Sequence, residues 1–117
     1  MDACLNLGFT YKCQGNFRGA VEFCRKAVRL DPSSFAYSTL GEVLYETRDT
    51  EGAIENLCRA IEIDPSYERA YLFLFKAIEK KGSASQLQKV VKFVEGQGPL
   101  SDKVVIPLQR LKRLKFY

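Results

Sequence analysis

Apolar residues recur at three- and four-residue steps along most of this chain, which is the spacing of one face of an α-helix. The pattern predicts a first helix that ends near residue 14, where Gly15 suits a left-handed stop. Residues that commonly cap helices stand before the later helical runs, at Asn16, Ser34, Asp49 and Ser83. We expect a chain of short antiparallel helices and no strand.

The pattern also repeats itself along the chain. A constant shift of 33 residues superposes two sets of positions. It places Leu7, Gly8, Ala20, Glu22, Ala27, Asp31 and Pro32 on Leu40, Gly41, Ala53, Glu55, Ala60, Asp64 and Pro65. A fixed period of this length is typical of stacked helix pairs. We expect Gly8 and Ala20, with their equivalents, where two helices cross closest, because small residues let backbones approach each other.

A third unit follows at a shift of 34 residues, and Pro99 ends it as Pro65 ends the second. Bulky residues stand at its close-packing positions, with Phe75 in place of the glycine and Leu87 and Val94 in place of two alanines. Such residues should splay this helix pair or shift its register. Atypical terminal units are common in repeat proteins, where they cap the stack.

These matched positions resemble the tetratricopeptide repeat over residues 1–99. The resemblance implies an all-α fold, a right-handed superhelical stack of antiparallel helix pairs with about seven helices. It divides the chain into repeats at 1–33, 34–67 and 68–99, followed by a basic capping helix or tail over residues 100–117.

The C-terminal segment has two possible helices, because Pro107 suits the first turn of a helix and is poor inside one. One would cover about residues 106–116, and the other would begin at Asp102 and kink at Pro107. Leu108, Leu111 and Leu114 share one side, and the surrounding basic positions are Arg110, Lys112, Arg113 and Lys115. In the family, such a helix packs its apolar stripe on the last repeat, and we expect that role here.

Charge is unevenly distributed within the net +4 of the chain. Residues 1–66 carry seven Lys or Arg against ten Asp or Glu, whereas residues 67–117 carry eleven against four. Electrostatic attraction to a negatively charged partner is therefore expected first at the C-terminal end. Docking of the basic tail to nucleic acid or an anionic membrane is an alternative, but the sequence disfavours both partners because it offers no aromatic stacking platform or nucleic-acid motif.

The composition argues against catalysis and metal binding. The chain has no histidine, and its four cysteines are too far apart for a zinc pattern. The Ser/His/Asp and Cys/His arrangements need a histidine, and the scattered glycines form no phosphate loop. We predict a protein that is not an enzyme and needs no cofactor. Its cysteines read as free thiols in a reducing cytoplasm, and no apolar run is long enough to span a membrane.

In the tetratricopeptide family, the first helix of each unit lines a concave groove. Carried over by alignment, the groove residues here are Leu5, Asn6, Phe9, Lys12, Thr39, Glu42, Tyr45, Arg69, Leu72, Phe73 and Lys76. Exposed aromatic residues flanked by charges suit a peptide or helix anchor site. The alternative is that these rings pack on each other or on the tail helix.

One specialisation of the family is excluded by the residues at these positions. Co-chaperones that grip the C-terminal carboxylate of heat-shock chaperones use basic and amide residues at five groove positions. Here those positions hold Leu5, Phe9, Thr39, Arg69 and Phe73, and only Arg69 fits. One cation cannot form a two-carboxylate clamp, so the groove is predicted to be partly hydrophobic.

The sequence therefore predicts a cytoplasmic protein-protein interaction module, acting as a scaffold, adaptor or chaperone-like protein, that binds a peptide or helical segment of another protein. The alternative is a self-associating structural fragment of a longer repeat array. The chain starts at the first repeat helix, so we expect that helix to leave a face open to a preceding repeat or to a second copy.

Overall fold

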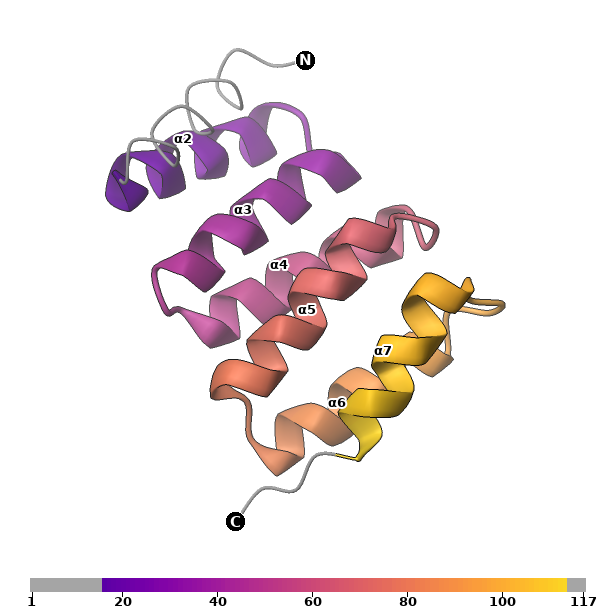
Figure 1. Cartoon of the computed structure of the whole chain (residues 1–117). Coiled ribbons are helices and arrows are strands. Elements are labelled where there is room, and N and C mark those ends of the chain that lie inside the picture. Colours follow the sequence, from indigo (N-terminus) through magenta and orange to yellow (C-terminus); the bar gives the residue numbers. More distant parts are fainter. Residues whose placement is uncertain (1–15, 114–117) are drawn as a thin grey trace.

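The computed structural model describes residues 16–113, and over this range the chain is all-α with no strand (Figure 1). Its helices are α2 (Phe17–Leu30), α3 (Ser34–Glu46), α4 (Thr50–Ile63), α5 (Glu68–Lys81), α6 (Ala84–Glu95) and α7 (Asp102–Lys112). The expected first helix and the stop at Gly15 lie outside the described residues. The predicted all-α stack of helix pairs is confirmed.

The helices form two layers (Figure 1). Helices α3, α5 and α7 lie side by side in one layer, since α5 contacts both α3 and α7. Helices α4 and α6 lie behind them, and α3 packs on both α2 and α4. The core runs through these contacts and is built mainly from small and branched aliphatic side chains together with Tyr71 and Phe75.

Polar side chains cap the helices near the expected positions. The carboxamide oxygen of Asn16 accepts from the Gly19 N–H at 3.1 Å, and Asp49 repeats this geometry one repeat later with the Gly52 N–H at 3.0 Å. Ser83 caps α6 in a reciprocal box with Gln86. These three predictions are confirmed.

The cap predicted at Ser34 is wrong by one residue. Ser33 has an extended backbone directly after Pro32, and its hydroxyl accepts from the Ala36 N–H at 3.1 Å. Ser34 is instead the first residue of α3, and its hydroxyl donates to the Ala60 carbonyl of α4 at 3.2 Å. The local sequence offered two adjacent serines, and the turn after the proline selects the first as the cap.

Gly41 marks the close crossing of α3 and α4, as predicted. A Cβ atom added to it would lie 2.6 Å from Leu57 Cγ and 3.3 Å from the Ala53 carbonyl oxygen. No side chain larger than hydrogen fits there unless the Leu57 side chain or α4 moves. The small residue at this position is therefore what allows the two backbones to approach.

The third pair, α5 and α6, is splayed as predicted. The backbones of α5 and α6 approach each other far less than those of α3 and α4. Phe75, at the position of Gly41, is only 3% exposed and belongs to the same buried cluster as Val90 and Val94. A bulky side chain at a crossing point holds two helices apart.

Helix α7 begins at Asp102 and contains Pro107, so the start expected at Asp102 is the one observed. Its apolar side, made by Val104, Leu108 and Leu111, is buried and α7 contacts both α5 and α6. Burial of this stripe is what a capping helix requires.

Among the described helices none is long and apolar enough to cross a membrane.

Candidate functional site

The predicted groove residues of α3 and α5 meet on the face formed by α3, α5 and α7, called here the α3–α5–α7 face. The repeat register places them on the first helix of each unit, which is the layer in front in Figure 1. Four predicted residues, Leu5, Asn6, Phe9 and Lys12, lie outside the described part of the chain.

An ion pair joins the two helices at the centre of this face. The Arg69 guanidinium of α5 donates to Glu42 Oε1 of α3 from Nε at 2.9 Å and from Nη2 at 2.7 Å. The Glu42 side chain is only 2% exposed, and a buried carboxylate is costly unless it is paired. Its hydrogen bond raises the pKa of Arg69 above the ordinary value. The charge of Arg69 is therefore balanced inside the molecule.

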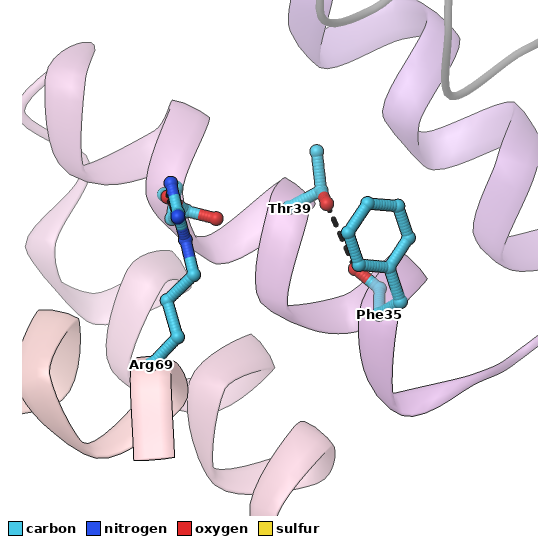
Figure 2. Close-up of polar contacts among 4 residues, drawn as sticks. Phe35, Thr39 and Arg69 are labelled. Atoms are coloured by element: carbon cyan, nitrogen blue, oxygen red, sulfur yellow. Dashed lines mark hydrogen bonds and ion pairs between the residues drawn. The ribbon is translucent and has the colours of Figure 1, made fainter. Parts of the chain in front are cut away.

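Thr39 lies beside this pair on α3 but faces little solvent. Figure 2 shows its hydroxyl directed at the Phe35 carbonyl, to which it donates at 2.8 Å within the same helix. Thr39 is 1% exposed, and the neighbouring Ser38 is buried as well. The α3 part of the predicted groove is thus largely closed, which single-residue alignment could not indicate.

Two aromatic rings and three cations form what we call the aromatic–cation cluster: Tyr45, Phe73, Arg69, Lys76 and Lys80. The rings of Tyr45 and Phe73 meet edge to face, with centroids 5.9 Å apart and an interplanar angle of 82°. Lys76 Nζ lies 5.0 Å from the centroid of the Phe73 ring, and Lys80 Nζ lies 5.2 Å from that of Tyr45. Such contacts stabilise a cation above a ring.

The aromatic rings of the cluster are partly packed within the molecule and partly exposed, so both the self-packing and the anchor interpretations apply to them. Tyr45 and Phe73 are half-buried and pack against the core and each other, as the self-packing alternative expected. Each ring also retains some exposure, and its lysine partner is exposed. Their use as anchors for a partner stays a prediction. Leu72 lies on the same helix and is 40% exposed.

The basic residues of α7 have different surroundings. Arg110 and Arg113 are exposed, whereas Lys112 Nζ pairs with Glu95 Oε2 of α6 at 3.0 Å. Lys115 lies outside the described residues. Sequence reasoning missed Ile106, which is 58% exposed on α7. Its signal was available, since the shift that places Pro65 on Pro99 also places Leu72 on Ile106.

The thiols of the described residues offer little chemistry. Cys24 is buried, and burial raises the pKa of Cys58 to about 12, with a smaller contribution from the nearby charge of Glu62. A thiol in this state is neutral at physiological pH and is a poor nucleophile. Within residues 16–113 no group of three His, Cys, Asp or Glu residues could hold a metal ion.

Comparison with known proteins agrees with this architecture. Two models of the tetratricopeptide repeat match the chain, at residues 2–34 and 36–67. No curated protein sequence matches it.

Solved structures show the same fold. The second TPR domain of human RPAP3, in complex with the HSP70 peptide SGPTIEEVD, is 17% identical with a TM-score of 0.72, covering 96% of this chain and 94% of that one. The first TPR of Spaghetti (RPAP3), bound to the HSP90 peptide SRMEEVD, is 18% identical with a TM-score of 0.69, covering 94% and 90%. A crystal structure of MamA is 28% identical with a TM-score of 0.62, covering 93% and 74%.

Proposed function

Because the chain belongs to the tetratricopeptide repeat family, we propose that its α3–α5–α7 face binds a peptide or helical segment of a partner protein. The observation that carries this proposal is the aromatic–cation cluster. Partly exposed rings beside cations, on two helices that pack on each other, give a partner both apolar area and charge. The RPAP3 domains of the same fold are described in complex with peptides, which supports a peptide as the ligand class.

The proposed binding mode differs from a clamp on a terminal carboxylate. Arg69 is the one cation at the five clamp positions described above, and it is already bonded to the buried Glu42. Moving Arg69 onto a ligand would remove two charge-assisted hydrogen bonds from the buried Glu42, at a cost in free energy. We therefore expect internal segments to bind as well as segments with a free C-terminus.

The wider role would be that of a scaffold, adaptor or chaperone-like protein. Its effect on a partner would come from binding at the α3–α5–α7 face. The free thiol of Cys58 suits a reducing compartment, and we propose the cytoplasm.

Selection of binders from a random peptide library displayed on phage, with the full chain as bait, tests the proposal. Enriched peptides should then be synthesised and titrated by fluorescence anisotropy. Phe73→Ala should weaken them by about 1–2 kcal/mol, which is about tenfold in Kd, because it removes half of the ring pair.

The matched control is Ile63→Ala, which removes an exposed aliphatic side chain from α4, outside this face. It should leave the affinities unchanged, and thermal melts of both variants separate lost binding from lost folding. A selection that enriches no peptide, or peptides equally weakened by both substitutions, would overturn the proposal.

A further inference from the structure

We propose that the bound segment is acidic and is held by its side-chain carboxylates, an inference that rests on the proposed function. The carboxylates would meet a cationic strip, which we define as Lys76 and Lys80 on α5 with Lys103 and Arg110 on α7. All four side chains are exposed, and no carboxylate of the described residues lies within ion-pair distance of them. Their charge is thus available to a partner.

The strip follows from the register of α5 and α7. The shift that places Pro65 on Pro99 also places Arg69, Leu72 and Lys76 on Lys103, Ile106 and Arg110. The same shift places Ala70, Leu74 and Ala77 on Val104, Leu108 and Leu111, and all six of these residues are buried. The two helices therefore bury equivalent sides. On the opposite side, α5 presents Arg69, Leu72 and Lys76, and α7 presents Lys103, Ile106 and Arg110.

Two exposed aliphatic residues lie within the strip. Leu72 is 40% exposed and Ile106 is 58% exposed, and they hold equivalent positions on two helices that contact each other. Packed helices have axes about 8–10 Å apart. A partner could match that spacing with residues three apart in an extended chain, at about 3.3 Å per residue. Residues seven apart in a helix, at about 1.5 Å per residue, match it as well.

The charges near the strip favour an acidic partner over a basic one. Glu68 and Glu79 on α5 and Asp102 on α7 offset part of the positive charge, and Glu68 also accepts a hydrogen bond from the Ser101 hydroxyl at 3.2 Å. Against these three carboxylates, the sequences of α5 and α7 together hold seven Lys or Arg residues. The cations are therefore in excess on these two helices. Exposed charge pairs are screened by salt, so the resulting binding should weaken as ionic strength rises.

Anisotropy titration with a designed peptide tests the inference. The probe is a short fluorescein-labelled peptide of Glu and Leu, acetylated and amidated so that it has no terminal charge. Controls are its Lys-for-Glu counterpart and a version with Ser in place of Leu. The Glu/Leu peptide should bind, more weakly at higher salt, and the two controls should bind at least about tenfold more weakly.

Paired charge reversals locate the site. Lys103→Glu combined with Arg110→Glu should weaken the Glu/Leu peptide by about tenfold or more. Lys26→Glu combined with Lys89→Glu changes the net charge equally on exposed positions of α2 and α6, and should have little effect. Equal weakening by both double variants, equal binding of the Lys peptide, or no binding of the Glu/Leu peptide would overturn the inference.

The outcome is distinguishable from failure of the proposed function. Library peptides that depend on Phe73 but are indifferent to the Lys103 and Arg110 reversals would overturn the acidic-segment inference and leave the binding role intact. A library selection that enriches no peptide would instead overturn the proposed function.

Discussion

The helix pairs α3–α4 and α5–α6 follow the same repeat pattern but pack at different distances. In the first pair, Gly41 lets α4 approach until Leu57 fills the position that a side chain would need. In the second, Phe75 occupies that crossing and is buried between helices whose backbones stay apart. The comparison indicates that the size of the residues at the close-packing positions, Phe75 with Leu87 and Val94 in the second pair, governs the helix separation.

The turns of the two pairs also differ. Arg48, between α3 and α4, has a left-handed backbone with φ of 68°. Gly82, at the equivalent place between α5 and α6, has φ of −76° and ψ of 163°, an extended conformation. The tight pair therefore needs a sharp left-handed turn, and the splayed pair uses a wider one.

The same contrast shapes the candidate site. On the tightly packed α3, the polar residues Ser38, Thr39 and Glu42 are buried. On α5 and α7, equivalent positions hold the exposed Leu72 and Ile106. The α5–α7 part of the face is therefore more exposed than its α3 part, and this is where we propose that the partner binds.

Removal of the Phe75 ring should have the largest effect. Phe75→Ala should lower the free energy of unfolding by about 3–5 kcal/mol, because the separated helices cannot close fully over the cavity. Urea denaturation measures the loss. Leu72→Ala on the same helix, where the side chain is 40% exposed, is the control and should cost much less. Equal losses for the two variants would show that Phe75 does not hold the pair apart.

Gly41→Val should have the next largest effect, with a loss of about 1–3 kcal/mol from overpacking. The added Cβ would lie 2.6 Å from Leu57 Cγ, so the Leu57 side chain or α4 must move. Gly96→Val at the end of α6 is the matched control, since a Cβ there meets its nearest atom at 3.4 Å, an ordinary contact. Denaturant midpoints that fall equally in both variants would contradict the close crossing at Gly41.

Much of the fold could be predicted from the sequence because its signals are local and repeated. The repeat shift located the close crossing at Gly41, and the bulky Phe75 predicted the splayed pair. The cap of α3 was misplaced because Ser33 and Ser34 are equally able to cap, and only the backbone turn distinguishes them.

The candidate site was less predictable because its properties depend on contacts between helices. Alignment placed Glu42 and Arg69 on the same face, but their pairing follows from how deeply α3 is buried. The edge-to-face contact of Tyr45 and Phe73 likewise depends on the separation of α3 and α5. Ile106 was missed because the repeat register was not extended past the third unit.

The smallest expected effect concerns the turn of the tight pair. Arg48→Gly should raise the free energy of unfolding by up to about 1 kcal/mol, since glycine adopts positive φ without the strain that a larger residue carries there. The gain is partly offset by the greater freedom of glycine in the unfolded chain. Arg59→Gly makes the same exchange at an exposed helical position of α4 and should instead cost about 1 kcal/mol. The free energies of unfolding of the two variants, measured by urea denaturation, should therefore change in opposite directions. A decrease for Arg48→Gly as large as that for Arg59→Gly would contradict a left-handed turn in the tight pair.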